Sequence, residues 1–198
     1  MVNRSYWSSR YQDSRTGWDI GYPSPPLAEY LDQLEDKSLR ILIPGAGNAY
    51  EAEYAWRSGF TQVYVLDIAP EPLQAFSRRV PDFPSDQLLE DDFFHHFGAY
   101  DLILEQTFFC ALNPESRVRS AYARQMAQLL SPGGKLVGLW FDLPQIGKPD
   151  EPPHGGTRDE YLGYLKPYFS VQTFAKATNS IKPRAGNELF GIFQKIAR

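Results

Sequence analysis

The sequence predicts an α/β fold built on a doubly wound, mostly parallel sheet. Short apolar runs alternate with helical patterns along most of the chain, and the last two strand patterns follow one another with no helix between them. Alternating strands and helices are typical of a parallel sheet covered on both faces. The two consecutive strands predict an antiparallel pair at one edge. For 198 residues we expect a single domain with a core of its own.

The individual elements follow from hydrophobic spacing and from the positions of Gly and Pro. Seven strands are predicted, at residues 40–43, 62–66, 88–89, 100–104, 135–141, 171–174 and 189–196. Helices are predicted at residues 27–34, 49–58, 71–80, 114–130 and 157–168. Residues 144–156 contain four Pro and three Gly without periodicity, so a loop is expected there. Residues 1–26 are polar, turn-rich and too aromatic for a disordered tail, and we expect them to pack over another part of the chain.

Composition excludes several classes of partner. The net charge of -4 with mixed signs predicts no basic surface for nucleic acid. No apolar run reaches the length of a membrane span, so no membrane association is expected. The single cysteine, Cys110, cannot form an internal disulfide, which is typical of a reducing cytoplasm. No self-complementary apolar surface is indicated, and we expect a monomer.

A glycine-rich turn followed by an acidic residue indicates a nucleotide-binding site. Gly45 and Gly47 follow the first strand, and Asp67 ends the second, where a carboxylate can accept both hydroxyl hydrogens of a ribose. Tyr50 stands where the dinucleotide fingerprint has its third glycine, which argues against a pyrophosphate. An ordinary strand-to-helix turn and, for Asp67, a helix cap are the alternatives.

Other candidate residues follow the third and fourth strands. Asp92 and Phe93 could hold an adenine ring, by accepting from its amino group and by stacking; a core Phe beside a solvated acidic turn is the alternative. The adjacent His95 and His96 lack the spacing of a metal site, and no metal is expected. Cys110 has no apparent base beside it and is expected to be a small buried residue.

Several motifs together resemble one family. Ile43 and Pro44 directly precede the first glycine. The matching pieces are Trp7-x-x-x-Tyr11, Thr16-Gly17-Trp18-Asp19, Ile43-Pro44-Gly45-Ala46-Gly47, Asp67-Ile68, Asp92-Phe93-Phe94, Thr107-Phe108-Phe109-Cys110-Ala111-Leu112 and Asn187-Glu188-Leu189-Phe190-Gly191. In this order and spacing the chain resembles the thiopurine, thiol and halide methyltransferases, a class I group that uses S-adenosylmethionine.

The resemblance implies a class I, Rossmann-like fold and assigns roles by position. It implies that residues 1–26 form a lid over a core of residues 27–198, with aromatics that attract the sulfonium cation of S-adenosylmethionine. The cofactor-binding residues that it implies are Trp7, Tyr11, Trp18, Gly45, Asp67, Asp92, Phe93 and Gln106. The partner would be a small-molecule methyl acceptor, with no resident metal.

No persuasive pair of base and nucleophile appears in the sequence, so no residue is assigned to catalysis. Our hypothesis is direct SN2 transfer to a soft nucleophile such as a thiol, a thiopurine or a halide. Arg117 could attract an anionic acceptor or form a surface salt bridge. The remaining alternatives are methylation of oxygen, nitrogen or a metalloid, a nicotinamide-dependent oxidoreductase, and a non-catalytic cofactor-binding protein.

Overall fold

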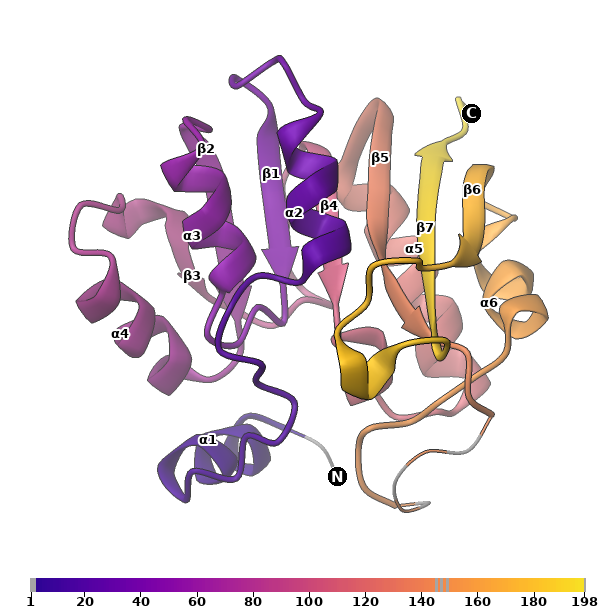
Figure 1. Cartoon of the computed structure of the whole chain (residues 1–198), viewed down its shortest axis with the longest axis horizontal. Helices are drawn as coiled ribbons and strands as arrows, with labels where there is room; N and C mark the ends of the chain where they lie inside the picture. Colours follow the sequence, from indigo (N-terminus) through magenta and orange to yellow (C-terminus); the bar gives the residue numbers. More distant parts are fainter. Residues whose placement is uncertain (1–2, 145, 147, 149, 198) are drawn as a thin grey trace.

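A seven-stranded sheet in the order β3-β2-β1-β4-β5-β7-β6 organises the computed structural model (Figure 1). The structure describes residues 3–144, 146, 148 and 150–197. Strands β1 to β5 are parallel to one another, and β7 is antiparallel to both β5 and β6. The strands are β1 (Arg40–Pro44), β2 (Gln62–Asp67), β3 (Leu88–Glu90), β4 (Tyr100–Gln106), β5 (Leu130–Phe141), β6 (Phe169–Lys176) and β7 (Glu188–Lys195). The predicted fold class is confirmed.

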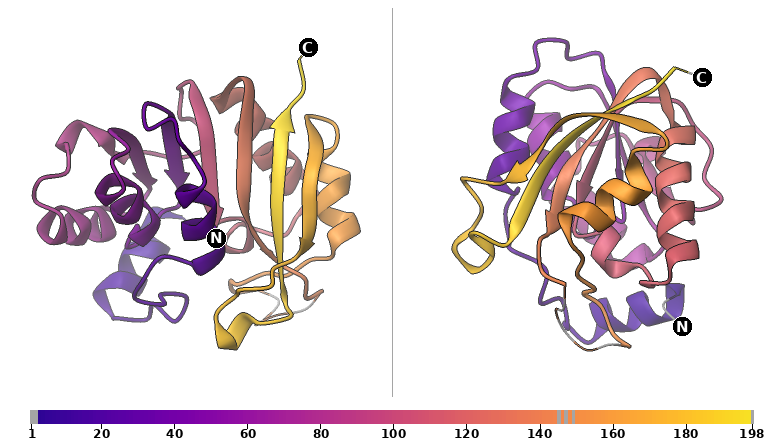
Figure 2. Two further views of the ribbon diagram at one scale, coloured as in Figure 1. Left: turned by 45° about the horizontal axis from the view of Figure 1, so that its top comes forward. Right: turned by 90° about the vertical axis from the view of Figure 1, so that its right-hand side faces the viewer.

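Helices cover both faces of this sheet (Figure 2). On one face lie α2 (Pro25–Asp32), α3 (Tyr50–Arg57) and α4 (Pro70–Arg79), and on the other α5 (Ser116–Leu129) and α6 (Arg158–Leu165). Each face has its own apolar cluster. Central strand β4 contributes to both, with Ile103 on the α5 side and Leu102 and Leu104 on the other, as expected for a strand buried on both faces.

The N-terminal helix α1 (Arg4–Gln12) was not expected from the sequence. None of its residues is fully buried, and Trp7 and Tyr11 form only one aromatic pair at helical spacing, which is too little to indicate an amphipathic helix. Its start is marked by Asn3, whose side-chain oxygen accepts from the backbone N–H of Tyr6. Figure 1 shows α1 below the carboxyl ends of the parallel strands, nearest to β1 and β2.

Several boundaries differ from the predicted ones. The Ser-Pro-Gly-Gly run at residues 131–134 was expected to precede β5, yet β5 begins at Leu130. The pairing with β4 jumps from Tyr100–Leu130 to Leu102–Lys135, so the run is accommodated as a bulge. Helix α6 ends at Leu165 and β6 begins at Phe169, each a few residues earlier than predicted. Of the loop predicted at 144–156, residues 145, 147 and 149 lie outside the described residues, and the rest is irregular.

Two connections at the carboxyl edge of the sheet contact α1 or the residues that follow it. The β5–α6 connection reaches it through an ion pair between Arg10 and Glu151, 3.6 Å apart. The β6–β7 connection contains the short 3₁₀ helix η3 (Lys182–Arg184), and Arg184 donates to the backbone carbonyl of Trp18 at 2.9 Å. No helix within the described ranges is long and apolar enough to cross a membrane.

Gly138 on β5 provides a first test of the packing. It pairs with Glu105 on β4, and a Cβ at residue 138 would lie 2.4 Å from the Glu105 Cβ and 2.7 Å from its carbonyl oxygen. We expect Gly138→Ala to destabilise the fold by about 1–3 kcal/mol through overpacking. The matched control is Gly163→Ala, in α6 with open space around it, which should stabilise by roughly 0.5–1 kcal/mol. Urea midpoints measure both, and equal midpoints would contradict this packing.

Candidate functional site

The site is at the carboxyl ends of β1, β2 and β4. Strand β1 lies between β2 and β4, so the connections that leave β1 and β4 run to opposite sides. In open α/β sheets such a switch point leaves a crevice in which ligands bind. The glycine-rich turn follows β1, Asp67 ends β2, and Gln106 ends β4. The fold therefore brings the glycine-rich turn, Asp67 and Gln106 to the same edge of the sheet.

The glycine-rich turn requires glycine at both positions. Gly45 and Gly47 have φ values of +57° and +54°, in the left-handed region. A Cβ at Gly45 would lie 2.1 Å from the ring of Phe108, and one at Gly47 would lie 3.0 Å from the hydroxyl oxygen of Tyr11. The backbone here is thus in close contact with an aromatic side chain on either side.

Asp67 connects the end of β2 to the glycine-rich turn. One carboxylate oxygen accepts from the backbone N–H of Gly47 and the other from that of Ala69, both at 2.9 Å. The side chain is buried, and burial raises the pKa of Asp67 to about 6, although the backbone N–H groups act against that rise. Each carboxylate oxygen has a second lone pair, so two further donors can be accepted. A pair of ribose hydroxyls matches that capacity.

Three N-terminal aromatic residues form one cluster over this carboxylate. The ring of Trp18 packs edge-on against those of Trp7 and Tyr11, with centroids 5.4 and 5.8 Å apart. Burial, and next the negative charge of Asp67, raise the pKa of the Tyr11 hydroxyl, so it stays protonated. Helix α1, which carries Trp7 and Tyr11, is attached to α4 by a hydrogen bond of 2.7 Å from Gln12 to Glu71. Trp7, Tyr11 and Trp18 therefore converge with Gly47 and Asp67.

Asp92 and Phe93 have different surroundings. The Asp92 carboxylate accepts from the backbone N–H of Phe94 at 3.0 Å and lies 2.9 Å from Nδ1 of His95. Phe93 is buried, and its ring contacts that of Phe108 with centroids 5.0 Å apart. Phe93 thus supports the ring that lies against Gly45, and Asp92 is half-exposed at the margin of the site.

Gln106 has an unsatisfied acceptor. Its side-chain Oε1 is buried and has no hydrogen-bond partner among the residues that the structure describes. A buried acceptor without a donor is costly, so such an atom indicates a missing partner. The position at the end of β4, together with the turn and Asp67, fits a ligand that brings its own donors. These residues therefore fit a nucleoside cofactor such as S-adenosylmethionine.

Other candidates are placed away from this chemistry. Arg117 is an exposed surface residue whose Nε lies 2.6 Å from Glu115, so it forms the salt-bridge alternative. Cys110 is buried, and burial strongly raises the pKa of its thiol, as for an unreactive core residue. Within the described part of the chain, no group of three or more His, Cys, Asp or Glu is arranged to hold a metal ion.

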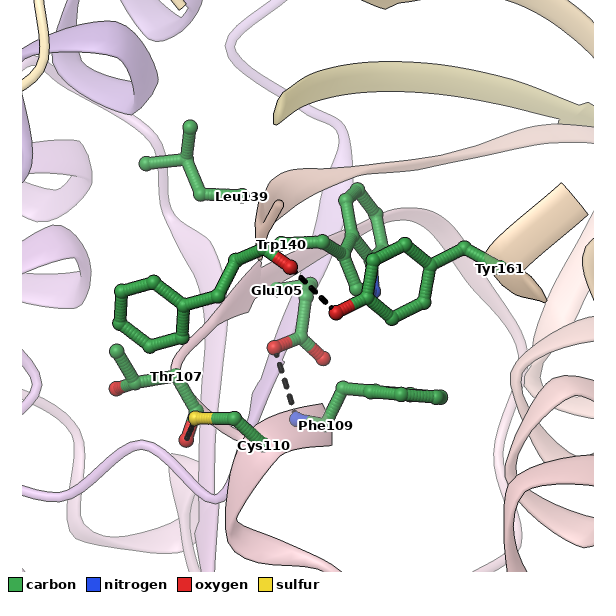
Figure 3. Close-up of a pocket in the computed structure, with 8 residues that line it drawn as sticks. Glu105, Thr107, Phe109, Cys110, Leu139, Trp140 and Tyr161 are labelled. Atoms are coloured by element: carbon green, nitrogen blue, oxygen red, sulfur yellow. Dashed lines mark hydrogen bonds between the residues drawn. The ribbon is translucent and has the colours of Figure 1, made fainter. Parts of the chain in front are cut away.

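A small cavity adjoins the site between β4, β5 and α6 (Figure 3). Its volume is about 10 Å³, and its lining is Glu105, Thr107, Phe109, Cys110, Leu139, Trp140, Phe141 and Tyr161. A larger, open cleft of about 280 Å³ lies between α1 and α4.

Sequence reasoning missed Glu105, Phe108 and Arg184. An acidic residue inside the apolar run of β4 was a signal for Glu105, whereas nothing local marks Arg184.

Comparison with known proteins identifies the family. Residues 2–196 match the family model described as Thiopurine S-methyltransferase (TPMT). The chain belongs to this family. A probable thiol methyltransferase 2 of Arabidopsis thaliana is 31% identical, with 96% of this chain and 84% of that protein covered. Thiocyanate methyltransferase 1 of Brassica oleracea is 29% identical, with 98% and 87% covered.

A solved structure agrees on the fold. The 1,6-didemethyltoxoflavin-N1-methyltransferase of Burkholderia thailandensis, with bound S-adenosylhomocysteine, superposes with a TM-score of 0.76 over 98% of this chain and 87% of that one, at 19% identity. The family and the fold make this chain a class I methyltransferase that uses S-adenosylmethionine and methylates a small-molecule nucleophile.

The raised pKa of Asp67 predicts a pH dependence of stability. Between 3.8 and about 6 the folded chain keeps a proton that the unfolded chain has released. The folded state then binds more protons, so this contribution to stability falls as pH rises through that window, by up to about 3 kcal/mol. In Asp67→Asn the contribution is absent. Urea unfolding from pH 4 to pH 7 should show the advantage of wild type shrinking with pH, and a constant difference would contradict the assignment.

Proposed function

We propose that the chain transfers a methyl group by SN2 to a small soft nucleophile, of the class of a thiol, a thiopurine, thiocyanate or a halide, at the carboxyl edge of its sheet. The carrying observation is the Gly47–Asp67 contact at the switch point beneath Trp7, Tyr11 and Trp18. The similarity to a probable thiol methyltransferase and to a thiocyanate methyltransferase supports a sulfur acceptor.

We further propose roles for the residues at this edge. Gly45 contributes a backbone contact in the first turn, Asp67 accepts hydrogen bonds from the two ribose hydroxyls, and Oε1 of Gln106 accepts a hydrogen bond from the cofactor. Asp92 and Phe93 lie on the adenine side. When bound, the cofactor supplies an electrophilic methyl group on a sulfonium sulfur.

The N-terminal segment, residues 1–26, acts as a lid over a Rossmann-like core of residues 27–198 in a single domain. Its aromatic rings present π faces to a cation and exclude water from the site. Arg184 holds the lid at the carbonyl of Trp18 and pairs with Glu188 at 3.4 Å. Alignment of donor and acceptor in a dry site can lower the barrier by as much as roughly 7–11 kcal/mol.

We propose that the chain works as a cytoplasmic monomer without nucleic acid, consistent with its one buried cysteine.

Calorimetric titration with S-adenosylmethionine tests the cofactor site. We expect wild type to bind, and Asp67→Ala and Gln106→Met each to bind at least about 10-fold more weakly, because a hydrogen bond from the cofactor to a charged or buried acceptor is lost. Asp13→Asn, at an exposed position after α1, is the matched control and should bind like wild type. Unchanged binding in both site variants, or no binding by wild type, would overturn the assignment.

A panel of acceptors tests the reaction. The wild-type chain is incubated with S-adenosylmethionine and, separately, with iodide, thiocyanate, hydrosulfide, an alkyl thiol and a thiopurine, and methylated products are measured in solution and headspace. We expect product with at least one sulfur nucleophile. Methylation of oxygen or nitrogen acceptors alone would contradict the proposed acceptor class.

A further inference from the structure

Glu105 is a buried carboxyl group that borders the small cavity and directly precedes Gln106, a proposed cofactor contact. It lies one residue before the end of β4 and is fully buried. Figure 3 shows its side chain between the turn that carries Thr107 and Cys110 and the ring of Tyr161. It is the one carboxyl group in the lining, whose other members are apolar or neutral. A carboxyl group enclosed in this way is costly unless it has a role or full hydrogen bonding.

Three donors fix the orientation of this carboxyl group. One oxygen accepts from the backbone N–H groups of Phe108 and Phe109 at 2.9 and 3.0 Å, and Oε2 accepts from the Tyr122 hydroxyl at 2.5 Å. A carboxylate has about four acceptor positions, so one position on Oε2 is left open. The same backbone turn places the ring of Phe108 against Gly45. The carboxyl group is thus rigidly connected to the turn that faces the cofactor site.

The cavity is suited to one heavy atom. Its volume of about 10 Å³ is close to what a single water molecule occupies by this measure. The aromatic rings of Phe109, Trp140 and Tyr161 exclude solvent around it. An anion would enter against the charge of an ionised Glu105 and would lose its hydration, whereas a neutral S–H group would pay neither cost.

We infer that Glu105 is the general base that accepts the proton of a thiol acceptor, so that the site favours nucleophiles with a proton to lose. This inference rests on the proposed function. The thiol sulfur gives its proton to Oε2 of Glu105 and its electron pair to the methyl carbon. The bond from that carbon to the sulfonium sulfur breaks, and its electron pair stays on the departing sulfur, which becomes a neutral thioether. Carboxylate and sulfonium charges are both neutralised in this step.

The surroundings of Glu105 suit a base that works near neutral pH. Burial raises the pKa of Glu105 to about 7, while its hydrogen bonds from Tyr122, Phe109 and Phe108 act against that rise. The titratable groups that face it are Cys110 on the 3₁₀ turn η2 (Phe109–Ala111), Tyr122 on α5 and Tyr161 on α6. Burial raises the pKa of all three, so they stay neutral. Arg184 and Glu188 lie farther out and act on Cys110 in opposite directions. An efficient base has a pKa near the working pH.

The test compares an acceptor that carries a proton with one that does not. Wild type and Glu105→Gln are assayed with 2-mercaptoethanol and with iodide from pH 5.5 to pH 9. For wild type, the thiol rate should rise with a midpoint near 7, below the pH at which alkyl thiols titrate. The iodide rate should fall over the same range, because the ionised carboxylate repels the anion. In Glu105→Gln the ratio of thiol rate to iodide rate should fall by about 10²-fold or more at pH 7.

Tyr122→Phe is the matched variant, because it removes one hydrogen bond and keeps the carboxyl group. Since the Tyr122 hydroxyl lowers the pKa of Glu105, the midpoint of the thiol profile should move to higher pH with its amplitude retained. An equal loss with thiol and iodide in Glu105→Gln would show a merely structural role and overturn the inference. An unmoved midpoint in Tyr122→Phe would overturn it as well.

A second readout does not depend on turnover. Carbon-13 NMR of the glutamate carboxyl groups, without cofactor, should contain one resonance that titrates near pH 7 and is absent from Glu105→Gln. A Glu105 resonance that titrates at ordinary glutamate pH would contradict the inference. Calorimetric binding of S-adenosylhomocysteine separates the two proposals: wild type that binds but shows no thiol-specific base leaves the proposed function standing, and wild type that does not bind removes both.

Discussion

The contact between Asp67 and the glycine-rich turn is the interaction on which the candidate site depends. A carboxylate at the end of β2 holds the backbone of Gly47, which follows β1, and so fixes the ends of two neighbouring strands relative to each other. The left-handed backbone at Gly45 and Gly47 is stable in this position because neither residue has a side chain that would strike Phe108 or Tyr11. Without that contact, the backbone of the turn that lines the crevice at the switch point would not have a fixed position.

The aromatic residues then build the walls of the site from three distant parts of the chain. Trp7, Tyr11 and Trp18 come from the N-terminal segment, Phe93 from the turn after β3, and Phe108 from the turn after β4. Phe93 and Phe108 hold one another edge-on, and Phe108 in turn contacts Gly45. The acidic and aromatic residues are therefore interdependent, since moving one ring changes the space above the turn and Asp67.

Those parts of the site that come from residues close together in the sequence could be predicted, whereas contacts between distant residues could not. Gly45, Gly47 and Asp67 could be predicted because a strand, a turn and the next strand follow each other within about twenty-five residues. Helix α1 was not predicted, because most of its residues are polar, none is fully buried, and Trp7 and Tyr11 form only a single aromatic pair at helical spacing. Glu105 on β4 accepts a hydrogen bond from Tyr122 on α5, and Arg184 donates one to Trp18, which is 166 residues away in the sequence. Such contacts leave no trace in spacing.

The buried carboxyl groups at this edge are more stable in their ionised form when a cationic ligand is bound than when a neutral one is bound. Glu51, Asp67, Glu105 and Glu188 are all buried, and burial raises the pKa of each. A nearby positive charge favours the ionised form of a carboxyl group, so a sulfonium and these carboxylates stabilise each other. On the proposed function, methyl transfer converts the sulfonium into a neutral thioether and removes that mutual stabilisation. This electrostatic contribution therefore favours the cationic cofactor over its neutral thioether product.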